Sequence, residues 1–255
     1  MNPEAASDRV NALHPAWHAL RHAPRARRAE LLTLFELGEQ IDEIPERIRE
    51  PGIAALKLAW WRDEIARIEA GKARHPLGQR VGALLSAEAL SWLRDLIGVQ
   101  EQRLAPTPTA NTRQWLELAG QRAAVERIAA ALCGGDDASA RRVGQFRCLV
   151  DELNRIGAPL RRGRCPLPLD LPTKQLLELP DAEFNQAVAA ILSELKSLAT
   201  PPPRATPALL RALHGETRAL YRTIRENPAA CRRHKTLLTP LALFWHGWRG
   251  VLLAK

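Results

Sequence analysis

Apolar residues recur along most of the chain at spacings of three, four and seven residues, which places them on one face of an α-helix. The first such stretch covers residues 31–48, and the second follows a break at Pro51 and Gly52. The apolar positions of the second stretch are Ile53, Leu56, Trp60, Ile65 and Ile68. We expect each set to form the buried face of a helix.

Further segments show the same helical periodicity, and none shows the sustained two-residue alternation that indicates a β-strand. Helices are expected at residues 87–104, 112–132, 138–156, 181–198, 207–225 and 237–253. Ser86, Asn111 and Asp181 stand where helix-capping side chains are expected. Loops are expected at residues 105–112, 165–173 and 200–207, and each is too short to link two domains. The pattern therefore predicts an all-α protein with an N-terminal tail at residues 1–12 and a single domain at residues 13–255.

The composition of the 255 residues, 46% hydrophobic and 25% charged, is that of an ordinary globular protein. No apolar run approaches the roughly 20 residues of a transmembrane helix, and the N-terminus lacks the basic-then-apolar order of a signal peptide. The four cysteines form no CxxC pair, which argues against a disulfide framework or a zinc site. We therefore expect a cytoplasmic protein without a transmembrane segment.

Lysine and arginine number 37 against 28 acidic residues, which gives a formal net charge of +9, and 31 of these cations are arginine. Such a balance suits a nucleic acid, an acidic lipid or a phosphorylated ligand. No nucleic-acid recognition motif accompanies the charge, so nucleic acid is not the expected partner. The alternative interpretation is a solvated, arginine-rich surface.

Two segments carry more specific motifs. Glu50 and Pro51 precede LKLAWWRDEIARIEAGKARHP at residues 56–76, and RRGRCPLPLDL at residues 161–171 directly follows a predicted helix. In this order and separation they resemble the squalene/phytoene synthase family of head-to-head prenyltransferases. The resemblance covers about residues 13–253. It implies an isoprenoid-synthase-like helical bundle around a central cavity.

The resemblance also implies a chemistry. Active members hold Mg²⁺ with two aspartate-rich motifs on facing helices, and the ions bind the diphosphates of two prenyl substrates. Hard cations neutralise the leaving diphosphate, and a dry apolar cavity protects the allylic cation from water.

This chain departs from the pattern at the first motif. Its family position falls on Asp42, Glu43 and Glu46, an acidic remnant interrupted by Pro45. A register shifted by two residues, anchored on Phe35, places Gln40, Ile41 and Ile44 there instead. The alternative to a site is that the three acids form a solvated helical face.

The second motif departs further, because its two carboxylate positions are occupied by Arg155 and Pro159. Asp151, one turn upstream, is either a remaining metal ligand or the i,i+4 ion-pair partner of Arg155. Arg155 is a candidate to bind a phosphate or carboxylate directly, with Arg161, Arg162 and Arg164 adding charge at the cavity mouth. The alternative is that these arginines lie on the surface at a helix C-terminus.

Two tryptophan pairs remain. Trp60 and Trp61 are candidates to line a prenyl cavity, although adjacent helical residues point about 100° apart and core packing is the alternative. Trp245 and Trp248 share an apolar helix face, which we expect to pack into the core, with a membrane-surface anchor as the second interpretation.

We therefore expect a family member with degenerate metal motifs and a non-catalytic role. The resemblance to the family's non-catalytic branch, the mitochondrial complex I assembly factors, suggests binding of an isoprenoid or lipid, or of a protein partner. No cofactor is then expected, and contact with the inner face of a membrane would be peripheral. The alternative is an active Mg²⁺-dependent transferase of prenyl groups, which requires the acids of residues 42–46 and Asp151 to face one cavity.

Overall fold

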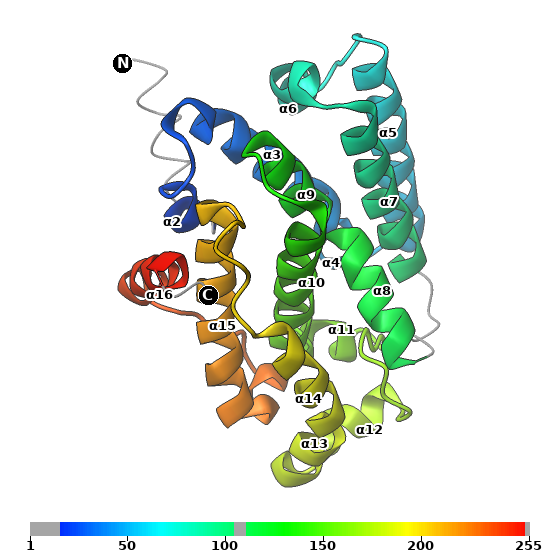
Figure 1. Cartoon of the computed structure of the whole chain (residues 1–255). Helices are drawn as coiled ribbons and strands as arrows, with labels where there is room; N and C mark the ends of the chain where they lie inside the picture. Colours follow the sequence, from blue (N-terminus) through cyan, green and yellow to red (C-terminus); the bar gives the residue numbers. More distant parts are fainter. Residues whose placement is uncertain (1–15, 105–110, 253–255) are drawn as a thin grey trace, which may run out of the picture.

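The structure, a computed structural model, describes residues 16–104 and 111–252, and in these ranges it is built from helices without a strand (Figure 1). The first half comprises α2 (Trp17–Leu20), η1 (Arg25–Arg27), α3 (Arg28–Asp42), α4 (Ile44–Arg47), α5 (Pro51–Glu69), α6 (Pro76–Val81), η2 (Gly82–Leu84), α7 (Ala87–Leu104), α8 (Thr112–Arg122) and α9 (Ala124–Leu132). The second half comprises α10 (Asp137–Asn154), α11 (Gly157–Arg161), α12 (Thr173–Glu178), α13 (Asp181–Ala187), α14 (Ala189–Leu198), α15 (Ala208–Glu226), η3 (Pro228–Arg232) and α16 (Pro240–Leu252). The all-α prediction is confirmed, whereas the predicted tail at residues 1–12 lies outside the described residues.

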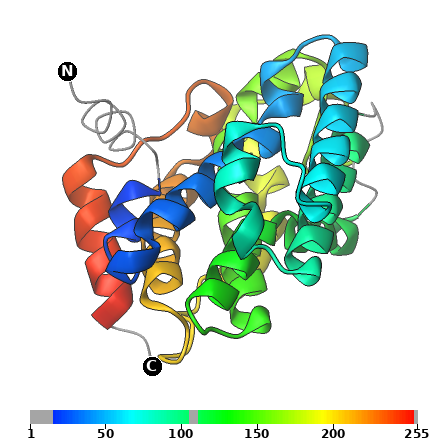
Figure 2. The same cartoon turned by 90° about the horizontal axis from the view of Figure 1, so that it is seen from above.

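The helices enclose two apolar cores. One lies among α2, α3, α5, α6, α7 and α9, and the other among α8 and α11–α14. Residues of α10 and α15 contribute to both cores, and these two helices pass through the middle of the bundle (Figures 1 and 2). Side chains on α10 are therefore able to reach both halves of the molecule.

Most helix limits follow the sequence pattern. The segment 87–104 is a single helix as predicted, and the Asn111 side chain caps α8 by accepting from the amide of Gln114 at 2.9 Å. The predicted helix 181–198 is divided at Val188 into α13 and α14. Asp181 does not cap α13, because its carboxylate instead accepts hydrogen bonds from two arginines of the η3 region.

The predicted buried face of α5 is wrong in its first half. Ile53, Leu56 and Trp60 are exposed, and the helix buries Ala54, Leu58 and Trp61 together with Ile65 and Ile68. The segment carries two apolar stripes, and both satisfy helical spacing. Only the packing of α5 on α7 decides which of them is covered.

The prediction that the face of Trp245 and Trp248 packs into the core is also wrong. In α16 the only buried residue is Gly247, and the large apolar side chains are exposed. We call these side chains, with Leu237 just before the helix, the α16 apolar face; they are Leu237, Leu241, Phe244, Trp245, Trp248 and Leu252. Among the helices that the structure describes, none combines the length and apolar character needed to cross a bilayer.

The segment after α11 brings the second sequence motif back toward α4. Gly163 follows α11 with φ +72°, a conformation that only glycine adopts without steric cost, and it ends the helix. The turn lets the Arg164 side chain reach the carbonyl of Pro45 in α4.

Candidate functional site

A cavity of about 250 Å³ lies between α3, α8, α10 and α15 and is closed on one side by the segment before α16. One part of its wall is apolar and includes Phe35, Leu96, Val125, Leu213 and Leu243. The remaining wall carries a dense set of charged side chains, which are Glu39, Asp42, Glu43, Arg122, Arg147, Asp151, Arg155, Glu216 and Lys235. The cavity therefore combines an apolar chamber with an ionic end.

The ionic end is centred on Asp42, the last residue of α3. Arg122 on α8 donates from Nε and Nη2 to the two oxygens of Asp42, each at 2.9 Å, and Gln100 on α7 donates to Oδ1 at 2.7 Å. Burial by itself would raise the pKa of Asp42, but the charge and hydrogen bonds of Arg122, with smaller contributions from Arg103 and Arg147, lower it well below its usual range. Asp42 is therefore ionised and bound to its guanidinium partner.

A second carboxylate, Glu152 on α10, lies behind this pair. It accepts hydrogen bonds from Trp115 Nε1 at 2.7 Å and from Arg122 Nη1 at 3.2 Å, and Arg103 lies 3.3 Å away. Arg103 also binds Glu46 on α4 at 2.9 Å. One chain of alternating charges thus joins α4, α7, α8 and α10.

The third part of the network faces the cavity directly. Arg155, at the end of α10, donates from Nε to Asp151 at 2.8 Å and from Nη1 to Glu43 at 3.4 Å. The i,i+4 ion pair expected from the sequence is therefore present. Lys235 lies 3.8 Å from Asp151 across the cavity wall. Asp42, Glu43 and Asp151 line one cavity, whereas Glu46 does not, and Arg155 lies between Asp151 and Glu43.

The space left among these groups tests whether a metal ion fits. The gap bounded by the acids, Arg103, Arg122, Arg155 and Pro159 measures about 10 Å³, the smallest volume that holds one water molecule. Mg²⁺ requires about six oxygen ligands and usually keeps several waters. In the described part of the chain, no group of three or more His, Cys, Asp or Glu residues has the arrangement of a metal site. With the arginines in place, this gap leaves no room for Mg²⁺ and its ligands, although Asp42, Glu43 and Asp151 also line the larger cavity.

This arrangement of an apolar chamber beside an acid cluster, in a bundle without strands, agrees with the comparisons. The model of the squalene/phytoene synthase family matches residues 14–253. The chain belongs to the squalene/phytoene synthase family. A crystal structure of a dehydrosqualene synthase in complex with ligand matches with a TM-score of 0.68 and 11% sequence identity, covering 92% of this chain and 89% of that one. This likeness confirms the predicted fold. No curated protein matches the chain.

The squalene/phytoene synthase motif RRGR lies away from the cavity wall. Arg161 donates to the carbonyl of Arg232 at 2.9 Å, Arg162 to that of Glu46 at 2.6 Å and Arg164 to that of Pro45 at 3.2 Å. The last two bonds satisfy carbonyls of the short helix α4. Of the four candidate anion-binding arginines, Arg155 alone is among the described residues that line the cavity.

The tryptophans of the other family motif also lie elsewhere. Trp61 is buried in the first core and Trp60 is 40% exposed, and neither is among the described residues that line the cavity. Both rings pack against the ring of His75: the centroid distance is 5.8 Å for Trp60 and 4.9 Å for Trp61. Their position on α5, behind α7, explains why they contribute packing rather than cavity wall.

Glu216 on α15 also lines the cavity and feels the charge of Arg147. Burial raises its pKa to about 8, only partly offset by the charge of Arg147, so the carboxyl is protonated at neutral pH. Its Oε1 atom is buried without a hydrogen-bond partner in the described structure. This oxygen lies against α16, since a Cβ atom on Gly247 would stand 2.9 Å from it.

Several members of the network were not found in the sequence. Arg103, Arg122 and Arg147 each stand on an amphipathic helix, where an arginine ordinarily indicates an exposed position. Arg122 meets its partner Asp42 across 80 residues of chain. No local spacing carries this information, and only the packing of α3 and α8 on α7 brings the groups together.

Proposed function

We propose that this chain is a non-catalytic member of its family that binds one isoprenoid or lipid molecule with an anionic head. The observation that carries the proposal is the ion-pair network. Guanidinium groups already neutralise the carboxylates that would hold Mg²⁺, and the gap that these groups enclose measures only about 10 Å³. The charge balance of a metal site is thus met without metal.

The size of the chamber supports binding rather than condensation. A volume of 250 Å³ is at the lower limit of ligand pockets, which span about 300–1,000 Å³. One prenyl chain can occupy such a space, whereas condensation requires two chains side by side. The apolar wall would hold the chain, since burying it removes apolar surface from water.

Arg155 and Lys235 are the groups we assign to the anionic head. Both line the cavity, and their side chains keep 31% and 43% exposure. Lys235 makes only a long contact of 3.8 Å with Asp151, so its ammonium retains donors for a phosphate. In this proposal the head binds cations directly rather than through metal ions.

Calorimetry with farnesyl diphosphate, with Mg²⁺ and with a chelator instead, tests the proposal. We expect binding in both conditions and no condensed product. The variant R155Q/K235Q should lose at least about tenfold in affinity, since each charged hydrogen bond contributes about 1.5–3 kcal/mol. Lys57→Gln, on the exposed side of α5, is the matched control and should bind as the wild type does.

The alternative is the active prenyltransferase, favoured by the shared cavity of Asp42, Glu43 and Asp151. Mg²⁺-dependent formation of a condensed product, abolished by Asp42→Ala, would establish it and overturn the proposal. Absence of binding in both conditions would also overturn the lipid-binding proposal and favour an assembly role with a protein partner.

A further inference from the structure

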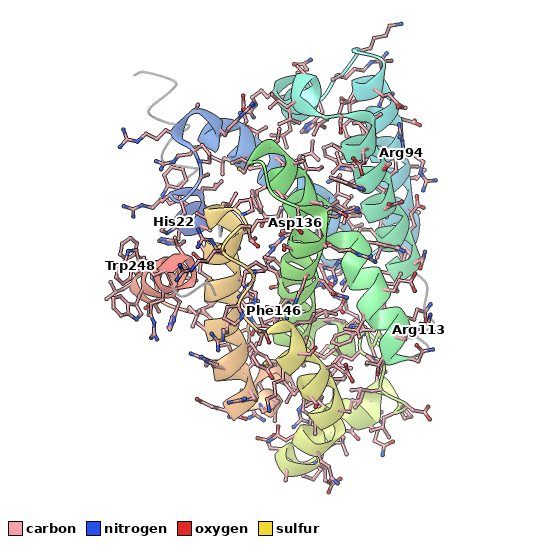
Figure 3. The ribbon with its side chains drawn as sticks, in the orientation of Figure 1. His22, Arg94, Arg113, Asp136, Phe146 and Trp248 are labelled. Carbon is pink, nitrogen blue, oxygen red and sulfur yellow. The ribbon has the colours of Figure 1, made fainter. Side chains whose placement is uncertain are left out.

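The α16 apolar face is the largest concentration of exposed apolar side chains that the structure describes. Leu241 is 76% exposed and Trp245 is 49% exposed, and the rings of Trp245 and Trp248 lie 5.4 Å apart. Successive members follow helical spacing, so they form one continuous stripe. Figure 3 shows Trp248 on α16 at the edge of the molecule, and α5 lies at the opposite edge (Figure 1).

Glycines on α15 and α16 explain why this stripe points outward. A Cβ atom on Gly215 would lie 2.3 Å from the carbonyl oxygen of His246, and one on Gly250 would lie 2.4 Å from that of Arg211. The two backbones therefore approach too closely for any side chain between them. Arg211 also donates to the carbonyl of Val251 at 2.6 Å and fixes the end of α16. The helix is attached by its small side, and its large side chains are left in solvent.

A group of cations lies beside the stripe. Arg218 and Arg222 stand one turn apart on α15, which packs along α16 and its Arg249. Burial and then the charges of Arg222 and Arg249 lower the pKa of Arg218. None of the three pairs with a carboxylate among the residues that the structure describes. Arg21 adds a fourth cation over the Phe244 ring, 5.2 Å from its centroid. The apolar stripe is thus bordered by uncompensated positive charge.

This combination of charge and aromatic residues selects one occupant. A second copy related by a two-fold axis would bring Arg222 and Arg249 of both chains together, and like charges at an interface are costly. The surface of an anionic bilayer offers phosphate groups to the arginines and an acyl boundary to the leucines. Tryptophan side chains favour the interface between these two layers.

We propose that α16 binds an anionic phospholipid bilayer by inserting its apolar face into the headgroup boundary, with Arg218, Arg222 and Arg249 on the phosphates. The inference does not depend on the proposed function. Leu237, at one end of the face, also lines the cavity, so the bilayer would lie beside the cavity wall. A lipid ligand would then have a short route from membrane to chamber.

Vesicle flotation of the full chain tests this inference. We expect flotation with phosphatidylcholine vesicles that contain phosphatidylglycerol, and loss of flotation with phosphatidylcholine alone. W245S/W248S should reduce partitioning at least about tenfold, and R222Q/R249Q roughly fivefold for each charge removed. L241S is a second, smaller perturbation of the face. All these side chains are exposed, so circular dichroism should remain that of the wild type.

Matched controls lie on other surfaces. L56S/W60S removes an equally exposed apolar pair from α5, and R80Q/R113Q removes two exposed arginines from α6 and α8. Both should float as the wild type does. Failure of the wild type to float with anionic vesicles, or unchanged flotation of W245S/W248S, would overturn the inference. A dimer that W245S/W248S dissociates, without flotation, would assign the face to a second copy and would also overturn it.

Discussion

Replacing Arg122 with methionine removes the central cation of the network while keeping a side chain of similar length. Asp42 would lose both guanidinium bonds of 2.9 Å, and Glu152 would lose one of 3.2 Å. The Arg122 side chain is only 5% exposed, so water cannot replace it without opening the bundle. The carboxylates of Asp42 and Glu152 would remain partly buried with less positive charge to balance them.

The expected loss of stability is large. Removing one partner of a buried ion pair costs about 3–5 kcal/mol, because the remaining charge stays desolvated. For a chain of this size, each kcal/mol lowers the melting temperature by about 2–4 °C, which predicts a decrease of roughly 6–20 °C near neutral pH. Arg62→Met is the matched control, since the Arg62 and Glu101 side chains are 54% and 33% exposed. Its cost should stay below about 1 kcal/mol.

The stability lost on replacing Arg122 with methionine should change with pH in a definite direction. In the wild type the pKa of Asp42 is lowered, so its contribution is present above the unfolded value of 3.8 and is lost as pH falls through the lower folded value. Without Arg122, burial instead raises the pKa of Asp42, so protonation at acid pH relieves the buried charge. The stability difference between the two proteins should therefore be largest at neutral pH and should narrow toward pH 3.8.

Urea denaturation followed by circular dichroism across this pH range provides the measurement. Adding Asp42→Asn to the methionine variant should recover part of the lost stability, because it removes the uncompensated charge. A loss below about 1 kcal/mol that does not change with pH would refute the argument that Arg122 is the counterion of Asp42.

Three further changes are expected to have measurable effects. In the wild type, the raised pKa of Glu216 means that only the unfolded state ionises this group between pH 4.5 and about 8, so stability declines there by at most about 1.4 kcal/mol per pH unit. Glu216→Gln should remove this decline. Urea denaturation at both ends of the range checks it, and equal pH profiles of the variant and the wild type would contradict it. Asn154→Leu should speed tryptic cleavage after Lys235. The Asn154 side chain accepts from the amide of Thr236 at 2.8 Å and donates to its carbonyl at 3.0 Å, which restrains the backbone beside the cleavage site. An unchanged cleavage rate would contradict this restraint. Trp115→Phe should lower the free energy of unfolding, measured by urea denaturation, by about 1.5–3 kcal/mol. The change removes the hydrogen bond of 2.7 Å that the indole N–H donates to the Glu152 carboxylate.

The pattern of α5 shows where sequence reasoning reaches its limit. The segment 53–68 was correctly assigned to a helix, since both of its apolar stripes have helical spacing. The choice between Leu56 and Leu58 as the buried residue depends on which stripe α7 covers. Helical periodicity defines faces, but it does not state which face meets another element.

The ion pairs of the site show the same limit of sequence reasoning. From the sequence we predicted that Arg155 and Pro159 occupy family carboxylate positions and that Asp42 belongs to an acidic remnant. The capture of Asp42 by Arg122 was not visible, because an arginine in an amphipathic helix has the same local pattern whether it faces solvent or a buried acid.

The sequence by itself determined the helical class, most helix limits and the family, because these depend on local spacing and residue type. Tertiary structure alone decided the partners of the acids, the size of the cavity and the exposure of the α16 apolar face. These properties arise where segments distant in sequence pack together. The close backbone contact at Gly215 and Gly250, which turns the tryptophans of α16 outward, is a property of two helices rather than one.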